Sequence, residues 1–322
     1  MPDRVRRPTA QGPDRVRRPT APDGLVVVDK PAGCTSHDVV ARMRRLAGTR
    51  KVGHAGTLDP MATGVLVLGV GRATRLLTYV VGADKEYVAT IRLGASTTTD
   101  DAEGELLTSG DASGVTRADI DREVALLTGS ILQVPSSVSA IKIDGQRAYA
   151  RVRAGEDVEL AARPVTVSEF AVGEVRRVDA GDGGMPALDV DVRVVCSSGT
   201  YIRALARDLG VRLGVGGHLT ALRRTRVGGY PLGMARTLDE LEAWPQDVPL
   251  DVLPLADAAR ASFPVRELTA VEAAALSFGK RIEAGPPTLS EPVAALSPAG
   301  ELVALLETSG EQARPVLVFA PA

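Results

Sequence analysis

One carboxylate in this chain lies where the backbone is strongly constrained. Asp59 falls within residues 53–64, a segment that holds three glycines and one proline and runs directly into the apolar residues 65–68. Glycine and proline set backbone shape without supplying a reactive group. Such a frame would fix the direction of an acid that works as a nucleophile or a general base. The same residues also suit an ordinary turn, because Asp-Pro pairs often begin turns.

Positive charge is concentrated in two short stretches, residues 42–51 and 223–226. Because the formal net charge of the chain is −2, a polyanion would have to bind a local patch such as one of these. A solvated helix face is the alternative interpretation. The first stretch runs into the Asp59 segment, which favours a functional role. Its basic residues are Arg42, Arg44, Arg45, Arg50 and Lys51.

Length and composition indicate an ordinary two-domain globular protein. The chain has 322 residues, of which 44% are hydrophobic and 24% charged. No apolar run approaches the ~18 residues of a membrane span, and no signal sequence is present, so we expect a cytoplasmic protein without membrane contact. Cys34 and Cys196 are far apart, which suits a reducing compartment. The three histidines and two cysteines form no ligand cluster, so no metal site is expected.

The N-terminus contains an exact duplication. The nonapeptide of residues 2–10 recurs as residues 13–21. It is basic, flanked by proline, and too poor in apolar residues to offset the entropy of ordering. We therefore predict a disordered basic tail over residues 1–23, with the folded chain beginning at Gly24.

Several elements are needed to position the Asp59 segment. Residues 25–28 predict a buried strand, and Ser36 predicts the N-cap of a helix whose apolar face lies within residues 39–46. Residues 73–81 are expected to be helical, and residues 87–93 alternate as a strand does.

Elements further along the chain follow the same local rules. Thr116 predicts the start of a helix closed by Gly129, residues 188–196 alternate as a strand with one buried face, and Thr200 predicts another helix start. Residues 237–240 match a capping box.

The order of these elements predicts the fold class and the domain boundary. Strands and helices do not alternate with the rhythm of parallel βαβ units, so we predict an α+β fold with a mixed, mainly antiparallel sheet flanked by helices. The three prolines of residues 244–254 suggest a boundary. We expect one domain over residues 24–250 and a small, largely β domain over residues 251–322.

Five segments with distinctive residues follow one another along the chain: residues 28–36 (VDKPAGCTS), 53–64 (GHAGTLDPMATG), 84–87 (DKEY), 196–203 (CSSGTYIR) and 222–224 (LRR). Together they resemble one family, the bacterial tRNA pseudouridine-55 synthases known as the TruB family. The resemblance runs from residue 24 to near residue 244, and residues 314–319 resemble the end of the family's PUA-type RNA-binding domain. Residues 133–140 depart from the family's thumb segment, because they lack its second proline and its aromatic residue.

The resemblance implies a pseudouridine synthase fold and an isomerase that converts uridine to pseudouridine in the T-loop of tRNA without a cofactor. By resemblance Asp59 is the catalytic carboxylate. The sequence leaves open whether it attacks C1′ of the ribose, attacks C6 of uracil, or removes a proton to give a glycal.

Further site residues come from the same resemblance. Arg203 matches the charge partner of the catalytic acid; without the family it would read as a surface arginine of an amphipathic helix. Tyr87 matches the residue that stacks on the target base, although it would otherwise read as a core aromatic. Tyr201 and Leu222 match other positions of the pocket.

The resemblance also implies how RNA is held. His54 matches the residue assigned to the space that a flipped uridine leaves, and residues 42–51 would bind the backbone of the T-arm. We expect a monomer that needs no obligate protein partner. Two alternatives remain open: a guide-RNA-dependent synthase, and an RNA-folding chaperone that opens the tRNA elbow without catalysis.

Overall fold

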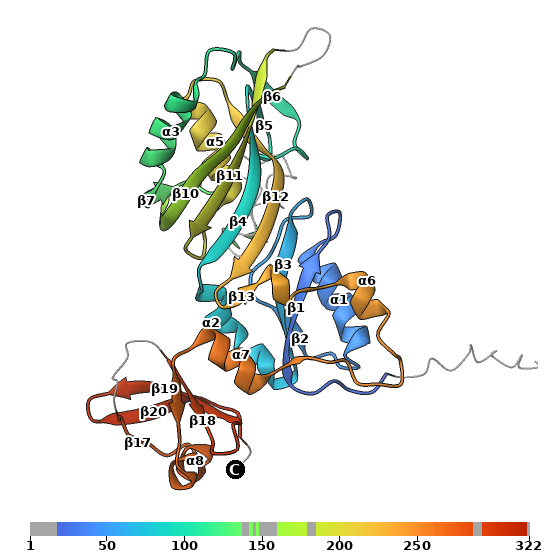
Figure 1. Cartoon of the computed structure of the whole chain (residues 1–322), viewed down its shortest axis with the longest axis vertical. Helices are drawn as coiled ribbons and strands as arrows, with labels where there is room; N and C mark the ends of the chain where they lie inside the picture. The colour runs from blue at the N-terminus through green and yellow to red at the C-terminus, as the bar shows by residue number, and fades with distance from the viewer. Residues whose placement is uncertain are drawn as a thin grey trace, which may run out of the picture.

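The structure is a computed structural model. It describes residues 18–136, 142–143, 146–147, 160–178, 185–285 and 292–320. Figure 1 shows an elongated molecule, with a long twisted sheet in its upper and middle parts and a small β domain at its lower end. Residues 1–17 of the predicted tail and residues 137–140 of the thumb segment lie outside the described residues.

Eleven strands of the described chain form one mixed sheet. Its main path runs β14-β1-β3-β12-β4-β11-β10-β7, with β13 beside β12, β15 beside β1 and β2 beside β3. Only β1 with β14 and β12 with β3 pair in parallel among these described strands, which confirms the predicted mainly antiparallel sheet. The strands are β1 (Gly24–Lys30), β2 (Val52–His54), β3 (Thr63–Val70), β4 (Lys85–Leu93), β7 (Gly129–Gln133), β10 (Arg163–Val178), β11 (Ala187–Cys196), β12 (Gly217–Val227), β13 (Tyr230–Pro231), β14 (Arg236–Thr237) and β15 (Leu253–Pro254).

Helices flank the sheet, as predicted, and they fall into two groups. Side chains of α3 and α5 share a core with β4, β10, β11 and β12, and side chains of α1 and α6 share another with β1 and β3. The predicted helix over residues 73–81 is a 3₁₀ segment, η1, followed by α2. The helical segments are α1 (Ser36–Leu46), η1 (Gly71–Arg75), α2 (Leu77–Gly82), α3 (Arg117–Leu126), α5 (Ile202–Arg212), η2 (Leu232–Met234), α6 (Leu238–Glu242), α7 (Leu255–Ser262) and α8 (Ala270–Ser277).

Three predicted helix boundaries were wrong. Two helix caps lie one residue away from the predicted position, and one predicted helix end is the start of a strand. The N-cap of α1 is Thr35, whose side chain and that of Asp38 form a capping box, so Ser36 is the first helical residue. The N-cap of α5 is Tyr201, one residue beyond the predicted start. Gly129, predicted to close α3, instead begins β7 with φ +93°.

The small domain is a five-stranded sheet in the order β16-β18-β19-β20-β17, with α8 packed against it. This confirms the predicted small, largely β domain. Two short hairpins, β5 with β6 and β8 with β9, lie outside both sheets. The remaining strands are β5 (Ala95–Thr97), β6 (Leu106–Ser109), β8 (Lys142–Ile143), β9 (Gln146–Arg147), β16 (Val265–Glu267), β17 (Ile282–Glu283), β18 (Val293–Leu296), β19 (Leu302–Ser309) and β20 (Gln312–Val318).

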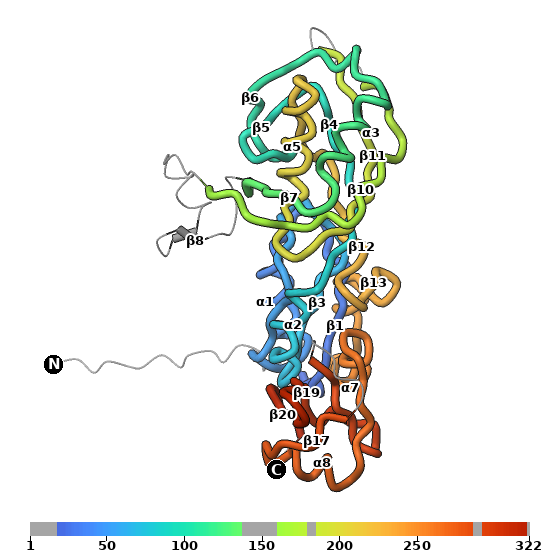
Figure 2. The backbone as a smooth tube through the Cα atoms, turned by 90° about the vertical axis from the view of Figure 1, so that its left-hand side faces the viewer, coloured from blue at the N-terminus to red at the C-terminus, as the bar shows by residue number. Residues whose placement is uncertain are grey.

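The two domains share a continuous hydrophobic core. Leu25 and Val27 of β1 belong to the same buried cluster as Leu296 and Leu305 of the small sheet and Phe319 beyond it. Figure 2, which shows the molecule from the side, places α7 between the large sheet and β19. The chain leaves the large sheet at Pro254 and enters the small one at Val265, so α7 is the joint between them.

Residues 18–23, assigned to the tail by sequence, contact the body of the protein. The Arg18 guanidinium donates to the backbone carbonyl of Trp244 (3.0 Å). The backbone N–H of Ala21 donates to the backbone carbonyl of Ala47 (2.9 Å). Asp23 accepts from the Arg72 side chain at 2.5 Å. These contacts order residues 18–23, because each gives a polar group of the segment a hydrogen-bond partner in the folded chain.

Candidate active site

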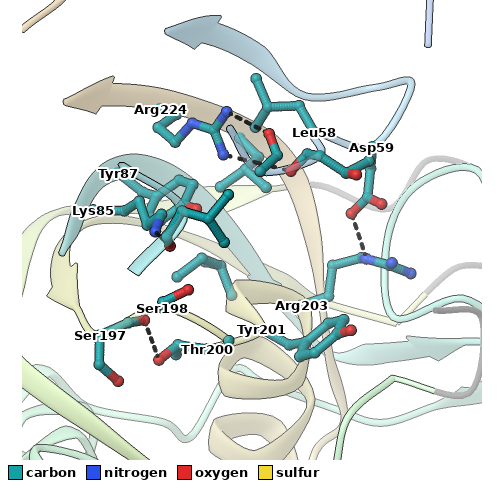
Figure 3. Close-up of a pocket in the computed structure, with 16 residues that line it drawn as sticks. Leu58, Asp59, Lys85, Tyr87, Ser197, Ser198, Thr200, Tyr201, Arg203 and Arg224 are labelled. Carbon is teal, nitrogen blue, oxygen red and sulfur yellow. Dashed lines mark hydrogen bonds and ion pairs between the residues drawn. The ribbon is translucent and has the colours of Figure 1, made fainter. Parts of the chain in front are cut away.

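A cavity of about 270 Å³ opens between the Asp59 segment, β4, β12 and the start of α5. Figure 3 shows side chains from all four segments turned toward it. Five of the residues proposed from sequence line this one cavity. They are Asp59, Tyr87, Tyr201, Arg203 and Leu222.

Asp59 and Arg203 form an ion pair across the cavity. Arg203 Nε lies 3.0 Å from Asp59 Oδ2; the Arg203 side chain is 5% exposed and that of Asp59 is 37% exposed. The guanidinium also donates to the carbonyl of Thr99 (2.7 Å) and lies 3.5 Å from the buried carboxylate of Asp101. Arg203 therefore lies between two acids, the buried Asp101 and the cavity-lining Asp59. A buried guanidinium needs such partners to offset the cost of leaving water.

The buried ammonium of Lys30 braces the loop that carries Asp59. Its Nζ donates to the carbonyls of Pro31 (2.9 Å), Cys34 (2.8 Å) and Pro60 (3.2 Å). Burial lowers the pKa of Lys30. Because Pro60 follows Asp59 directly, this network fixes the backbone on which the carboxylate stands.

Ser36 holds the other side of the same loop. Its hydroxyl donates to the carbonyl of Leu58 (3.2 Å) and accepts from the Leu58 N–H (2.9 Å). The backbone carbonyl of Asp59 itself accepts from the Ala62 N–H (3.1 Å), which closes a turn. The residues on both sides of Asp59 are thus hydrogen-bonded to α1 or to the end of β1.

Arg224 supports the loop from β12. It is 1% exposed, and its guanidinium donates to the carbonyls of Val65 (2.7 Å), Gly56 (3.1 Å) and Thr57 (3.4 Å). Gly64 has φ +96°, and a Cβ there would lie 2.2 Å from the Arg224 carbonyl. The loop can therefore pass this close to β12 only with glycine at position 64.

The arginines of the second basic stretch, residues 223–226, are paired with acids or buried within the fold. Arg223 pairs with Asp29 (2.6 Å) and Arg226 with Asp84 (2.7 Å), while Arg224 is buried beneath the Asp59 loop. Residues 223–226 thus stabilise β12 and its neighbours. The positions of these arginines in the sequence do not reveal their partners.

Tyr87 and Lys85 reach the cavity from the same face of β4. Tyr87 is 8% exposed, and burial raises the pKa of its phenol, so it is neutral at physiological pH. Lys85 Nζ donates to the carbonyls of Val81 (2.6 Å) and Ala83 (2.5 Å). Burial, with the nearby charge of Arg224, lowers the pKa of Lys85 to about 8.

His54 does not line the cavity. It lies at the end of β2, and its ring packs edge-on against that of His37, with 5.7 Å between ring centroids. Burial, together with the positive charges of His37 and Arg224, lowers the pKa of His54. The imidazole is therefore biased toward its neutral form.

The first basic stretch lies on the exposed face of α1 and the turn after it. Arg42 pairs with Glu242 at 3.4 Å, and the Arg44 guanidinium donates to the carbonyl of Val52 (3.3 Å). The other three, Arg45, Arg50 and Lys51, are exposed. These three side chains present positive charge to solvent beside the element that anchors the Asp59 loop.

The sequence did not single out Lys30, Ser36, Lys85 or Arg224 as parts of this site. From sequence, Lys30 only follows a predicted strand, Ser36 is predicted as a helix N-cap, and Arg224 belongs to a short basic stretch. Within the described residues, no group of three or more His, Cys, Asp or Glu side chains is arranged to hold a metal ion. None of the described helices is long and apolar enough to cross a membrane.

Family models match most of the chain. Residues 44–202 match "TruB family pseudouridylate synthase (N terminal domain)", residues 203–253 match "tRNA pseudouridylate synthase B C-terminal domain", and residues 263–320 match "tRNA Pseudouridine synthase II, C terminal". The first model ends inside α5, so the cavity is built from residues of two matched segments.

Known proteins resemble the chain over nearly its whole length. It is 64% identical over 305 residues to "tRNA pseudouridine synthase B" of Arthrobacter sp. (strain FB24), covering 92% of this chain and 97% of that protein. It is 61% identical to the protein of the same name from Thermobifida fusca (strain YX), covering 92% and 99%.

Solved structures resemble the fold at lower identity. A chain of "Crystal Structure of a Cbf5-Nop10-Gar1 Complex" superposes with TM-score 0.67 and 27% identity, covering 92% of this chain and 85% of that one. A chain of "Structure of H/ACA RNP bound to a substrate RNA containing 2'-deoxyuridine" gives TM-score 0.66 with the same identity and coverage. With the cavity, its loop and these matches taken together, the chain belongs to the TruB family of pseudouridylate synthases.

Proposed function

We propose that this protein converts uridine to pseudouridine in tRNA, at position 55 of the T-loop. The observation that supports this most directly is Asp59, held on a braced loop with Arg203 at 3.0 Å inside the cavity. The names of the 58–64% identical relatives supply the substrate class.

Asp59 is the catalytic carboxylate in this proposal. The reaction breaks the C–N glycosidic bond, turns the uracil and joins its C5 to C1′ of the same ribose. C5 loses a proton and N1 gains one, so atoms and electrons balance without a cofactor. Attack at C1′, attack at C6 and proton removal to a glycal each use an ionised carboxylate. Arg203 offsets the negative charge of that carboxylate and holds its oxygen in place.

Tyr87, Tyr201 and Leu222 form the walls that receive the base. Tyr87 offers a neutral aromatic face, and stacking of a base on such a ring is worth ~1–3 kcal/mol. Leu222 and the Tyr201 ring exclude water, which strengthens the electrostatic interaction between Asp59 and Arg203. A detached uracil would stay within these walls while it turns.

Binding requires that the target uridine leave its stack, at a cost of a few kcal/mol. His54 lies outside the cavity, which suits a side chain that contacts the RNA left behind rather than the flipped base. Arg45, Arg50 and Lys51 would bind phosphates of the T-arm, together with Arg42 and Arg44.

The protein acts as a monomer in the cytoplasm, without guide RNA or protein partner. The two free cysteines, Cys34 and Cys196, suit a reducing compartment. The assemblies named in the titles of the structural relatives are properties of those proteins.

The test uses the purified protein alone with an unmodified tRNA transcript. We expect one pseudouridine per tRNA, located in the T-loop by mass spectrometry of nuclease fragments. Asp59→Asn is the matched variant, because it keeps the side-chain volume and removes the charge. Binding without pseudouridine in the wild type would contradict the proposal and favour a chaperone, and activity that required a guide RNA would favour the guided class.

A further inference from the structure

The side chain of Gln133 is joined to the backbone of Tyr201 by two hydrogen bonds. Gln133 is the last residue of β7 and is 2% exposed. Its Nε2 donates to the Tyr201 carbonyl (3.1 Å), and its Oε1 accepts from the Tyr201 N–H (2.8 Å). One carboxamide thus satisfies both backbone groups of one residue, as a neighbouring strand would.

This contact lies where α5 begins. Tyr201 is the N-cap of α5, in an extended conformation and without a side-chain cap bond. The first N–H groups of a helix lack partners within the helix and must find them elsewhere. Gln133 supplies a partner for the Tyr201 N–H and adds a second donor to the Tyr201 carbonyl, which also accepts from the Leu205 N–H within α5 (3.2 Å). It therefore acts on the turn that directs Tyr201 toward the cavity.

A second contact ties the same segment to α5 further along the helix. The Arg207 guanidinium donates to the carbonyl of Val134 (2.7 Å) and pairs with Asp100 (3.3 Å). Asp100 has φ +59° and follows Thr99, whose carbonyl binds Arg203. The end of β7 and the residue after it therefore bind α5 at Tyr201 and at Arg207. Asp100 binds the same helix through Arg207.

We propose that Gln133 is a positioning residue: it fixes the Tyr201 backbone so that the Tyr201 ring is placed in the cavity. This rests on the proposed function, because its main readout is turnover. It also gives Gln133, the first residue of the segment 133–140, a role that does not require direct contact with RNA. Misplacement of a cavity group by about 1 Å costs as much as ~100-fold in rate.

The main test compares Gln133→Met and Gln133→Glu with the wild type. Methionine keeps the volume and removes both bonds, whereas glutamate keeps an acceptor for the Tyr201 N–H and loses the donor to the Tyr201 carbonyl. We expect the single-turnover rate with saturating enzyme to fall about 10- to 100-fold for Gln133→Met, with the tRNA Kd changed by less than about 2-fold. Leu132→Ala, on the neighbouring residue that is 74% exposed, is the matched control and should keep the wild-type rate.

A double mutant separates positioning from general destabilisation. In a Tyr201→Ala background no ring remains to be placed, so Gln133→Met should then lower the rate by less than about 2-fold. An unchanged rate in the single variant, or an equal loss in both backgrounds, would overturn the proposal. If Gln133→Met fails to fold, the same comparison is made with Gln133→Glu.

Hydrogen exchange provides a readout independent of turnover. Loss of the Gln133 acceptor should speed exchange of the Tyr201 amide at least about 10-fold in Gln133→Met, while amides of β3 keep their wild-type rates. Unchanged exchange at Tyr201 would contradict the inference about Gln133. An inactive wild-type protein would contradict the proposed function and leave this comparison intact.

Discussion

Positive side chains occur both in the frame beneath the cavity, formed by Lys30, Arg203 and Arg224, and on the exposed face of α1. In the frame they are buried and paired, whereas on α1 they face solvent. Lys30, Arg203 and Arg224 are all buried and are surrounded by carbonyls or carboxylates. Arg45 and Lys51 are exposed on and just after α1. Buried charge with fixed partners sets the geometry of the backbone and of Asp59, whereas exposed charge remains available to a polyanion.

Removal of the Asp59 charge should have the largest effect. We expect Asp59→Asn to lower the single-turnover rate by at least about 1,000-fold, because an amide is neither an effective nucleophile nor a base. The tRNA Kd, measured by filter binding, should change less than about 3-fold. A variant with substantial turnover would show that another group performs the chemistry.

Arg203→Ala should lower the rate by about 100-fold or more, because it leaves two carboxylates without their shared buried cation. Arg223→Ala is the matched comparison, since Arg223 also pairs with an acid, Asp29, but its side chain is 36% exposed. Its rate should fall far less. Equal losses in the two variants would mean that burial of the cation is not what matters.

Lys30→Met should reduce the free energy of unfolding by about 3 kcal/mol, because three backbone carbonyls lose their donor. Lys51→Met, the same substitution on the exposed side, should change it by no more than about 0.5 kcal/mol. Urea unfolding followed by circular dichroism measures both. Similar values for the two lysines would remove the contrast between the regions.

Lys85 should make stability depend on pH in a defined window. Its pKa is about 8 in the folded protein and 10.5 without the fold, so between these values the unfolded chain binds a proton that the folded chain does not. The unfolding free energy should therefore rise with pH there, by up to about 1.4 kcal/mol per unit, relative to Lys85→Met. Below pH 8 both states hold the proton and the difference should be flat. A difference that stays constant from pH 8 to 10 would exclude this linkage.

The smallest effect is expected on the basic face of α1. Each of Arg45→Gln and Arg50→Gln should lower the dependence of log Kd on log salt by about 0.7–0.9, the loss of one phosphate contact. The rate at saturating tRNA should stay the same. Unchanged salt dependence in both would place the RNA backbone elsewhere on the protein.

Residues of the cavity could be predicted from sequence because they fall in short segments that resemble those of a known family. The structure brings Asp59, Tyr87, Tyr201, Arg203 and Leu222 to one cavity, although they are spread over more than 160 positions. Periodicity also predicted the strands around them, since alternation in residues 188–196 has one dominant physical cause, a half-buried strand.

The frame could not be predicted, because side-chain bonds to distant carbonyls depend on tertiary register. Arg224 reaches the Asp59 loop only because β12 pairs in parallel with β3 at Gly64. Ser36 and Thr35 are both suitable N-caps, and it is contact with Leu58 that assigns Ser36 to the loop instead. Gln133 is hydrogen-bonded to Tyr201, which lies 68 positions away along the chain, so no local pattern reveals this contact.

The core that continues from β1 through α7 into the small sheet has a consequence for cooperativity. Phe319, the last but one of the described residues, is 3% exposed within the cluster that also holds Leu25 and Val67 of the large sheet. Its backbone carbonyl accepts from Arg72 of η1 (2.5 Å). The small domain therefore cannot be removed without exposing part of the catalytic domain's interior, so the two should melt in a single transition and pass through folding as one unit.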